Sequence, residues 1–514
     1  MAEPEVLRTD VLVVGAGPSG LMAANVLARR GVDAIVVDGK DGPTRESRAL
    51  VVQARSMELY DQLGLAERIL AERGAAVGAI LAFRHRVLGR VPLRSFAEGL
   101  TPFPDVTVYE QSRNERLLVD ALAAHGREVR WRHRLLALDA QASSVAATLE
   151  GPDGPVVVEA RYVIGADGAH SAVRELHGIP FEGVTNEHTF FVADAIGASG
   201  LVEGVVNIRM SPDDILLSFP MGEARHHRIL GVVRDADLDE QDRLPERLVR
   251  SRIARGFTVG YRSSTWFATY RLHHRVAARF RDGRCFLVGD AAHIHSPVGG
   301  QGMNTGLQDA HNLACALGDV LAGGMPPSRL DRYEAERRPV ARRLVATTDR
   351  LFGLVTSESR PARIVRGRLL PMFGPAAVRL VPRLIGGRRL FGFLSQIRIR
   401  YRMSPLAPTR SQVRDDIVGK RLPYAAGDPS NLNALRSFRW QVHGYGAPAD
   451  LVRAVAESLG IEHHVFPPAA GRLRSDRLYL VRPDGFVAAE ASVAAGRRAR
   501  AGSVPAGFRE QLDG

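Results

Sequence analysis

Residues 9–20, near the start of the chain, have the sequence TDVLVVGAGPSG. Residues 9–14 are a short apolar run typical of a buried parallel strand, and residues 21–30 have the apolar periodicity of a helix. A second apolar run at residues 32–37 ends in Asp38. Strand, glycine-rich turn, helix and strand together make a βαβ unit, so this stretch predicts a Rossmann-like α/β fold.

The glycines of this turn match the dinucleotide-binding fingerprint. Gly15 permits the tight turn, Gly17 lets the backbone approach a pyrophosphate, and Gly20 lets helix and strand pack closely. Asp38 lies 18 residues beyond Gly20, where a carboxylate accepts hydrogen bonds from ribose hydroxyls. The fingerprint therefore predicts a dinucleotide site, while its spacing leaves the identity of the dinucleotide open.

Two further glycine-rich motifs follow apolar strands. One strand leads into GADGAHSAVR at residues 165–174, and another leads into GDAAHIHSPVGGQGMNTG at residues 289–306. A helix is predicted from Leu307 to about Leu321. Backbone N–H groups at a helix start have no intrahelical partner and lie at its positive end, so the third motif predicts an anion site.

In this order and at these separations, the three motifs resemble those of the class A flavin-dependent monooxygenases of the para-hydroxybenzoate hydroxylase fold. Within that group the chain is similar to the aromatic-polyketide and phenolic hydroxylases, which include drug-modifying members. The resemblance implies one non-covalently bound FAD, with NADPH or NADH as co-substrate. It also implies hydroxylation of an aromatic small molecule by O2 through a flavin C4a-hydroperoxide.

Carried over position by position, the resemblance assigns FAD to all three motifs and to segments between them. The residues expected to bind FAD are Gly15, Gly17, Pro18, Ser19, Gly20, Asp38, Arg48, Gln111, Asp167, Asp290, Pro297, Gly300, Gly302, Met303 and Asn304. Pro297 would lie over the reacting edge of the flavin, and Arg48 would contact the phosphate and flavin region. These two residues are the catalytic candidates.

The resemblance also separates the parts of the cofactor. Asp290 would bond the ribityl chain, Gln111 would lie beside the flavin, and Asp167 is linked to both FAD and NAD(P)H. The N–H groups of residues 302–304 would face the flavin N1–C2=O. Arg55, close to Arg48 in sequence, could face a phosphate or nicotinamide nucleotide, or could be a solvated loop charge.

A second sheet is predicted from about Thr185 to Tyr270, where apolar and polar residues alternate in short runs separated by turns. Residues 77–108 are expected to add strands to it. In the family this sheet roofs the substrate cavity. The side chains proposed to line the cavity are Val192, Asp194, Asn207, Phe219 and Met221.

The net charge of +13 is concentrated in one segment. Residues 359–414 contain thirteen arginines and no Asp or Glu, so the rest of the chain is formally neutral. The aromatic-basic interleaving of single-strand nucleic-acid binders is lacking, so no nucleic-acid partner is predicted. A basic amphipathic helix here could lie on an anionic membrane. We favour helices that pack across the flavin and sheet domains, with arginine stems covering apolar surface.

Few residues suggest metal or thiol chemistry. Cys285 and Cys315 lie in apolar segments, which indicates buried side chains and no disulfide framework. The pairs 293/295 and 273/274 are histidines, but neither has a third convergent ligand, so no metal site is predicted. The sequence shows neither a signal-peptide pattern nor an uninterrupted apolar stretch of about 18 residues, which favours a cytoplasmic protein.

The predicted fold class is α/β, with an antiparallel-sheet substrate domain inserted into a Rossmann-like FAD-binding domain. The FAD-binding domain would span residues 1–184 and, with a helical linker, residues 271–404, and the substrate sheet residues 185–270. Residues 405–514 resemble, more weakly, the thioredoxin-like C-terminal domain of larger phenolic hydroxylases. The stretch LYLVRPDGFVA at residues 478–488 predicts a hairpin there. Since this domain contains no cysteine, a structural or assembly role is expected.

Three alternatives stay open beside the hydroxylase. A reductase or dehydrogenase on the same fold would reduce its substrate without consuming O2, and a non-catalytic flavoprotein would sequester a ligand or act as an assembly partner. A halogenase usually carries a W-x-W-x-I-P stretch, but Trp131, Trp266 and Trp440 are isolated. The expected partners are O2 and a small aromatic molecule of antibiotic biosynthesis or modification, and the chain is expected to be a monomer or homodimer.

Overall fold

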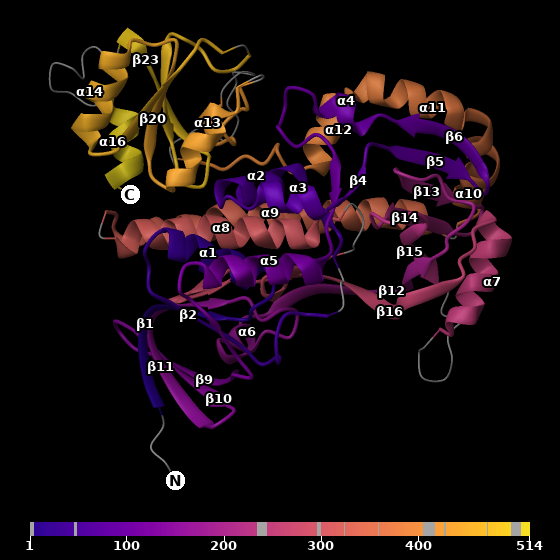
Figure 1. The fold of residues 1–514 in the computed structure, drawn as a ribbon, viewed down its shortest axis with the longest axis horizontal. Coiled ribbons are helices and arrows are strands. Elements are labelled where there is room, and N and C mark those ends of the chain that lie inside the picture. Colours follow the sequence, from indigo (N-terminus) through magenta and orange to yellow (C-terminus); the bar gives the residue numbers. More distant parts are fainter. Residues whose placement is uncertain are drawn as a thin grey trace.

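The computed structural model describes residues 5–45, 49–233, 244–295, 300–322, 324–357, 359–403, 417–425, 428–469, 471–494 and 505–513. In these residues the chain forms two eight-stranded sheets, a four-stranded sheet and a small three-stranded sheet. Figure 1 shows one large sheet at the lower left, the other at the right and the four-stranded sheet at the upper left. The molecule is therefore organised around separate sheets, with helices between them.

The first large sheet grows from the βαβ unit. Its main path runs in the order β17-β18-β11-β1-β2-β8. These strands are β1 (Glu5–Val14), β2 (Ala34–Asp38), β8 (Val129–Trp131), β11 (Gly154–Gly165), β17 (Arg281–Asp282) and β18 (Cys285–Leu287). All neighbours from β18 to β8 pair in parallel, so their carboxyl ends lie at one edge. The predicted Rossmann-like α/β architecture is confirmed.

One detail of this sheet differs from the prediction. The sequence suggests two strands, at 156–158 and 161–164, but β11 runs without a break between them. The intervening Glu159 pairs in register with Arg8 of β1 and forms an ion pair of 2.9 Å with it. The glutamate between the two apolar runs is thus a strand residue whose charge is paired across the sheet. The antiparallel strands β9 (Arg134–Ala140) and β10 (Val145–Gly151) extend the sheet beside β11.

Three helices stand next to one another above this sheet in Figure 1: α1 (Pro18–Arg29), α5 (Gln111–Ala123) and α8 (Gly302–Leu321). Helix α1 packs against both α5 and α8. Every residue of α8 from Asn304 to Val320 is buried, so the polar side chains between its apolar positions are covered as well. The central helix of the molecule therefore begins at the third glycine-rich motif.

The second large sheet has the order β19-β16-β12-β15-β14-β13-β5-β6. Its strands are β5 (Ala79–Phe83), β6 (Arg86–Val91), β12 (Phe181–Ile196), β13 (Val206–Met210), β14 (Ile215–Pro220), β15 (His226–Val233), β16 (Ser263–Ala277) and β19 (His293–Ile294). All of its pairs are antiparallel except β13–β5. The sheet extends beyond the predicted 185–270 because β12 and β16 continue back toward the first sheet. Helix α7 (Glu246–Phe257) covers one of its faces.

The C-terminal unit is a four-stranded sheet in the order β21-β20-β22-β23. It consists of β20 (Gln441–Tyr445), β21 (Glu462–Phe466), β22 (Arg477–Val481) and β23 (Val487–Ser492), with helices α14 (Ala449–Leu459) and α16 (Ala506–Asp513). Strands β22 and β23 are antiparallel, so the predicted hairpin is confirmed. The unit has a hydrophobic core of its own, and its likeness to thioredoxin stays a prediction.

The hairpin turn of this unit is inserted into the first domain. The Arg482 guanidinium bonds Glu336 of helix α9 (Asp331–Thr356) at 2.6 and 2.9 Å, and it also pairs with Asp484 at 2.6 Å. Asn312 of α8 donates to Asp484 at 3.0 Å. All four side chains are buried. The C-terminal unit is therefore joined to α8 and α9 by a buried ionic network.

Candidate functional site

The three glycine-rich motifs meet at the carboxyl edge of the first sheet. They follow β1, β11 and β18, which lie next to one another in the sheet, and Asp38 ends β2 on the other side of β1. In open α/β sheets, ligands bind in the crevice outside the carboxyl ends of the strands. The strand order thus brings segments separated by more than a hundred residues to one place.

Close packing explains two glycines of the fingerprint but not the third. A Cβ at Gly15 would lie 2.4 Å from the Ala166 carbonyl oxygen, and one at Gly20 would lie 1.9 Å from the Gly15 carbonyl oxygen. A Cβ at Gly17 would have no heavy atom within 4 Å outside its chain neighbours. The protein itself gives no steric reason for glycine at position 17, whereas a closely approaching pyrophosphate does. The turn of residues 15–20 between β1 and α1, called the cradle below, therefore fits a dinucleotide.

The start of α1 supplies donors for such a group. The first helical bond joins Leu21 N–H to the Gly17 carbonyl at 2.9 Å, so the N–H groups of Ser19 and Gly20 precede the helical ladder. Pro18 has no N–H and suits the first turn, where none is needed. Asp38 accepts hydrogen bonds from Ala16 N–H at 2.7 Å and Lys40 N–H at 2.8 Å, which fixes its carboxylate beside the turn.

The second motif contains Asp167, whose carboxylate can accept a further hydrogen bond. Asp167 Oδ2 accepts from Val173 N–H at 3.1 Å, while its buried Oδ1 has no hydrogen-bond partner among the described residues. Burial raises the pKa of Asp167 above its usual value. A buried oxygen without a donor is costly, so this atom suits a ligand that brings one.

Arg174 joins the second motif to the third. Its guanidinium donates to the Ala169 carbonyl at 2.9 Å and to the Ala291 carbonyl at 3.2 Å. It also lies 4.1 Å from the centre of the Phe181 ring, at the beginning of β12. The arginine of the sequence motif is thus a buried connector between loops, and we assign it no contact with a ligand.

The third motif is anchored by a buried ionic cluster of His293, Asp309 and Arg337. His293 Nε2 lies 2.7 Å from Asp309, which also accepts from Arg337 at 2.6 Å and from Gly289 N–H at 3.3 Å. Burial alone would raise the pKa of Asp309, but Arg337 and His293 outweigh it and keep that pKa below its usual value. His293 is thereby engaged in a pair with a carboxylate, while Asp290 is exposed.

The start of α8 is held in place by the side chain of Asn304. Its amide oxygen accepts from Gln53 N–H at 2.8 Å, and its amide nitrogen donates to the carbonyls of Val51 at 2.8 Å and Gly300 at 2.7 Å. The first helical bond runs from Thr305 N–H to the Gln301 carbonyl, so the N–H groups of residues 302–304 lie ahead of the ladder. Sequence reasoning considered only the backbone of Asn304 and missed this side-chain latch to β3 (Val51–Val52).

The remaining cofactor candidates differ in what the structure says of them. Gln111 begins α5, accepts from Ala49 N–H at 3.1 Å and donates to Glu115 at 2.9 Å. Met303, in the first turn of α8, accepts from Asn114 through its sulfur. Arg48 and Pro297, the two catalytic candidates, lie outside the described residues.

Arg55 has neither of the roles suggested for it. It is 4% exposed, pairs with Glu58 at 3.0 Å, donates to the Asp484 carbonyl at 2.7 Å and lies 5.4 Å from the centre of the Phe486 ring. The partners from residues 484–486 belong to the C-terminal unit. Arg55 is therefore part of the contact between the two units, and is neither a phosphate ligand nor a solvated charge.

The five substrate candidates do not share one face of the second sheet. Asn207 lies opposite Ser218 in the β13–β14 pair, and its amide bonds the backbone of Val202 and Val205 at 2.9–3.1 Å. Phe219, the neighbour of Ser218, points to the other face because adjacent strand residues alternate. Asn207 is thus turned away from Phe219 and is occupied by its own loop, which removes it as a candidate on that face.

Asp194 is occupied by a partner that sequence reasoning missed. Its two carboxylate oxygens accept from Arg228 Nε and Nη2, each at 2.6 Å, and both residues are buried. The Arg228 guanidinium also lies 5.3 Å from the centre of the Trp266 ring. Asp194 therefore contributes an internal ion pair to the sheet. Val192 lies on the same strand face and is 3% exposed.

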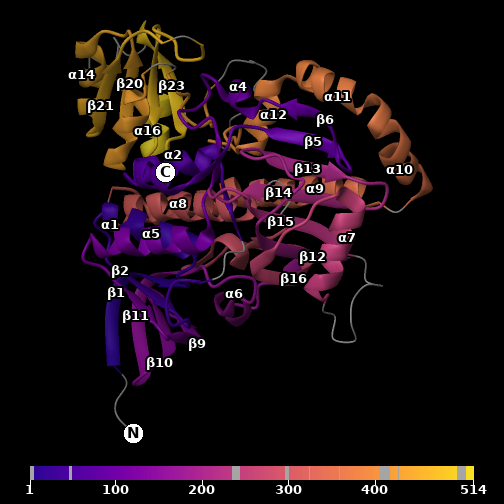
Figure 2. The same cartoon turned by 45° about the vertical axis from the view of Figure 1, so that its right-hand side comes forward.

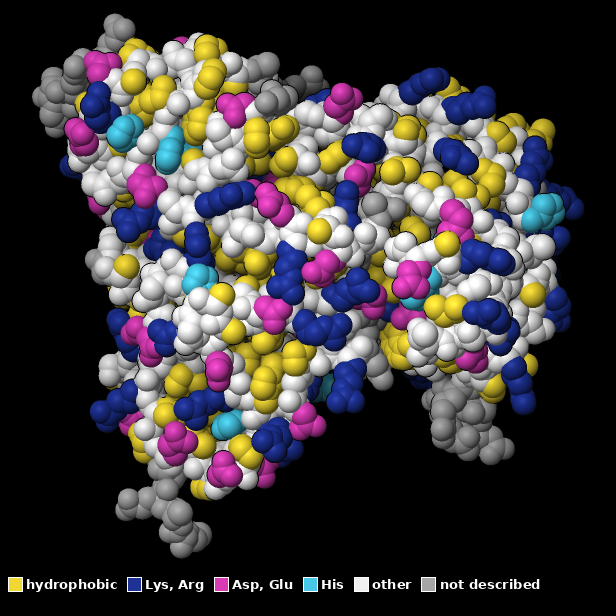
Figure 3. All heavy atoms as spheres, viewed as in Figure 1, with side chains coloured by type: hydrophobic (Ala, Val, Ile, Leu, Met, Phe, Trp, Pro, Cys, Tyr) yellow, Lys and Arg dark blue, Asp and Glu magenta, His cyan; other side chains and the backbone are white. Residues whose placement is uncertain are grey.

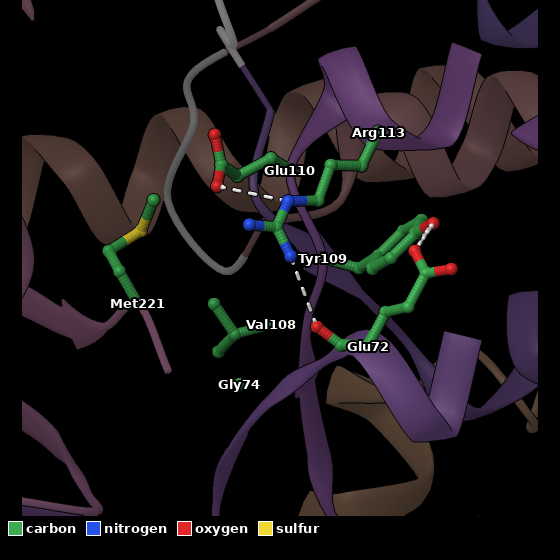
Figure 4. A pocket seen from close by; sticks show the side chains of 7 residues that line it. All are labelled: Glu72, Gly74, Val108, Tyr109, Glu110, Arg113 and Met221. Atoms are coloured by element: carbon green, nitrogen blue, oxygen red, sulfur yellow. Dashed lines mark hydrogen bonds and ion pairs between the residues drawn. The ribbon is translucent and has the colours of Figure 1, made fainter. Parts of the chain in front are cut away.

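Met221, directly after β14 of the second sheet, lines a pocket (Figure 4). The pocket is bordered by β4 (Gly74–Ala76) and β7 (Val106–Val108) of the three-stranded sheet and by the start of α5. In Figure 4 the Arg113 side chain extends between Glu110 and the Glu72 carbonyl, which it approaches to 3.7 and 3.3 Å. Met221 thus faces a polar recess close to Gln111.

The chain matches a protein family and has relatives of known name. A family model described as FAD binding domain matches residues 8–348. The 12-dehydrotetracycline 5-monooxygenase/anhydrotetracycline 6-monooxygenase of Streptomyces rimosus is 34% identical over 427 residues, covering 81% of this chain and 80% of the relative. The rifampicin monooxygenase of Rhodococcus hoagii is 31% identical over 519 residues, covering 93% and 95%.

A solved structure extends this similarity to the fold. The anhydrotetracycline hydroxylase OxyS from Streptomyces rimosus superposes with a TM-score of 0.75 at 30% sequence identity, over 95% of this chain and 96% of that one. The family match spans the βαβ unit, both later motifs and the second sheet. The chain therefore belongs to this FAD-binding family and is a flavin-dependent monooxygenase of the aromatic hydroxylase type.

Proposed function

We propose that the chain uses NADPH or NADH and O2 to hydroxylate a phenolic or polycyclic aromatic small molecule. The observation that carries this proposal is the convergence of the three motifs at the carboxyl edge of the first sheet, beside the open space at Gly17. Bound FAD would supply the redox chemistry, accepting a hydride from the nicotinamide and passing one atom of O2 to the substrate. The relatives named for anhydrotetracycline and rifampicin support a polycyclic substrate.

In this proposal the residues of the chain bind, orient and exclude water. Gly15, Gly17 and Gly20 would hold the pyrophosphate, and Asp38 the adenosine ribose. The exposed Asp290 would bond the ribityl chain. The N–H groups at the start of α8 would stabilise negative charge on the reduced cofactor, because they lie at the positive end of a long buried helix.

The substrate would lie between the flavin and the second sheet. Phe219, Val192 and Met221 remain candidates for its apolar surroundings. A water-excluding cavity at this position favours oxygen transfer over loss of the oxidant as peroxide. Arg48 and Pro297 keep their proposed roles beside the flavin, on the strength of the family resemblance alone.

The proposal is tested with the purified protein reconstituted with FAD. An aromatic panel that includes tetracycline-type and rifamycin-type compounds should contain a molecule that accelerates NAD(P)H oxidation, with matched O2 uptake and one atom of labelled oxygen in the product. Reduction of the added compound without labelled oxygen would instead identify a reductase. FAD and ligand binding with no turnover of any panel member would favour a ligand-sequestering flavoprotein.

The Asn304 latch gives a prediction about the cofactor. Asn304→Ala removes three hydrogen bonds that hold residues 51–53 and Gly300 to α8, so FAD affinity should fall by about 1–3 kcal/mol, or roughly 5- to 150-fold. Titration of the apoprotein with FAD, followed by flavin fluorescence, measures the change. Asn431→Ala is the matched control, because Asn431 is equally buried but bonds Pro423 and Tyr445 in the C-terminal unit. An unchanged FAD affinity in Asn304→Ala would contradict the latch.

A further inference from the structure

We propose that the chain binds the surface of anionic membranes through the arch formed by α10 (Arg360–Ile364), η4 (Val365–Leu369), α11 (Leu370–Ile385) and α12 (Gly387–Leu394). The arch follows the outer edge of the second sheet in Figures 1 and 2, from α10 at the right to α12 on the side of the C-terminal unit. This inference is independent of the hydroxylase reaction. It concerns where the protein acts, through a surface that contains none of the proposed site residues.

One side of the arch is fixed to the protein. Val378 of α11 packs on Gly89 of β6, where a Cβ would lie 2.8 Å from the valine side chain, and Gly374 faces Leu88 in the same way at 2.7 Å. Arg366 is 8% exposed and donates to the Ser357 carbonyl at 2.7 Å and the Pro212 carbonyl at 3.2 Å. As expected from the sequence, these helices pack on the sheet domain, but only with one of their two sides.

The other side presents an apolar stripe to solvent. Successive members are three, four or seven residues apart, which is the spacing of one helical face, except for the adjacent pair Met372 and Phe373. They are Val365 (51% exposed), Leu369 (44%), Met372 (72%), Phe373 (54%), Leu380 (51%) and Leu384 (81%). Soluble proteins rarely leave such contiguous apolar surface uncovered, so the stripe indicates a contact partner.

Arginines flank this stripe without acidic residues between them. Between Ser359 and Met403 the chain has no Asp or Glu, and the exposed arginines of the arch are Arg360, Arg363, Arg368, Arg379, Arg383, Arg388 and Arg389. Arg363 pairs with Asp213 of the adjacent loop at 3.0 Å. Figure 3 shows basic and apolar side chains adjoining one another over the region of α11. The surface therefore combines apolar contact area with a strong positive charge.

Charge favours an anionic bilayer over a second copy of the chain as the occupant of the stripe. In a second copy of the chain, the same stripe would bring another set of arginines, with no acidic residue of the arch to pair with them. An anionic bilayer offers acyl chains to the stripe and phosphate groups to the guanidinium groups, which bind phosphate well. The observed combination matches a lipid headgroup surface.

The mode of binding is interfacial. No single helix among the described residues is long and apolar enough to cross a membrane, although α10–α11 and α12 pass that test together across a bend of 87°. Because α11 is docked on β6 along one side, only its outer stripe can enter a bilayer. The arch would then lie in the plane of the headgroups, with its arginines at the level of the phosphates.

Vesicle sedimentation tests this with the full-length FAD-loaded protein. Wild type should pellet with phosphatidylglycerol/phosphatidylcholine vesicles and stay in solution with pure phosphatidylcholine, and salt at about 1 M should release it because charge pairing is screened. The double variant Met372→Asp, Leu384→Asp should bind at least about tenfold more weakly, since two exposed side chains no longer transfer into the lipid. Arg379→Glu combined with Arg383→Glu should lose the dependence on phosphatidylglycerol.

Matched control variants lie on the exposed side of helix α7. Arg247→Glu and Leu248→Asp change the same residue types there, at positions that are exposed to solvent, and should bind vesicles as wild type does. Equal pelleting with both vesicle types, or equal binding by the arch and α7 variants, would overturn the proposal. A dimer in sedimentation velocity that is lost in Met372→Asp, Leu384→Asp, without vesicle binding by wild type, would assign the stripe to a second copy instead.

Discussion

Alanine at Gly20 is expected to prevent the cofactor cradle from forming, whereas alanine at Gly17 should leave the protein folded and weaken only FAD binding. A Cβ at Gly20 would lie 1.9 Å from the Gly15 carbonyl oxygen and 3.0 Å from its carbon. Both atoms are backbone, so the turn between β1 and α1 would have to open. A Cβ at Gly17 meets nothing within 4 Å, and its φ of −80° and ψ of −178° suit alanine.

The two variants separate packing from ligand contact. Gly20→Ala should destabilise the apoprotein by about 3 kcal/mol or more, because overpacking against backbone cannot be relieved by a side-chain rotation. Gly17→Ala should stay within about 0.5 kcal/mol of wild type in the absence of FAD. Its FAD affinity should fall by at least about tenfold, since the methyl group occupies the approach of the pyrophosphate.

Urea unfolding of both apoproteins and fluorescence titration with FAD provide the measurements. An FAD affinity of Gly17→Ala equal to that of wild type would show that the open space beside Gly17 is not occupied by the cofactor. A loss of apoprotein stability in Gly17→Ala matching that of Gly20→Ala would give both glycines a packing role. Either result would remove the observation on which the pyrophosphate assignment rests.

The sequence predicted the cradle well because its information is local. Each motif directly follows an apolar strand, and parallel strands present their carboxyl ends at one edge, so the motifs had to converge once the strands were neighbours. The buried helix after the third motif was equally predictable from its periodicity. The hairpin at residues 478–488 also follows from the Pro-Asp-Gly signal between two apolar runs, although its second strand continues to Ser492.

The errors concern charged residues whose partners are distant in sequence. For Arg55 the sequence leaves a ligand contact or a solvated charge open, and for Asp194 it predicts a place in the substrate cavity. Their partners are instead Asp484 and Phe486 for the first and Arg228 for the second. A carboxylate on the expected face of a strand has the same local pattern whether it meets a substrate or an arginine 34 residues away. Alternation specifies the face of a side chain in a strand, and it carries no information about what approaches that face.

Breaking the Arg482 network is expected to have the largest effect on stability. Arg482→Met keeps an apolar stem of similar length but leaves Glu336 and Asp484 buried without their guanidinium partner. All three residues are at most 3% exposed. Removing one partner of a buried ion pair typically costs about 3–5 kcal/mol, because the remaining charge is neither hydrated nor compensated. The C-terminal unit should consequently detach from α8 and α9 at lower urea concentrations.

Arg474, an exposed arginine of the same unit, provides the control. Arg474 pairs with Asp476 at 2.9 Å with both side chains more than half exposed, so Arg474→Met should cost no more than about 1 kcal/mol.

Burial alone would raise the pKa values of Glu336 and Asp484, but Arg482 outweighs it and lowers both. Carboxylates with lowered pKa stabilise the fold above their unfolded value of about 4 and lose that contribution as pH falls through the folded one. The difference between wild type and Arg482→Met should therefore be full at neutral pH and shrink in acid, where protonation removes the uncompensated charges. A difference that is independent of pH would mean that Arg482 acts through packing of its stem rather than through its charge.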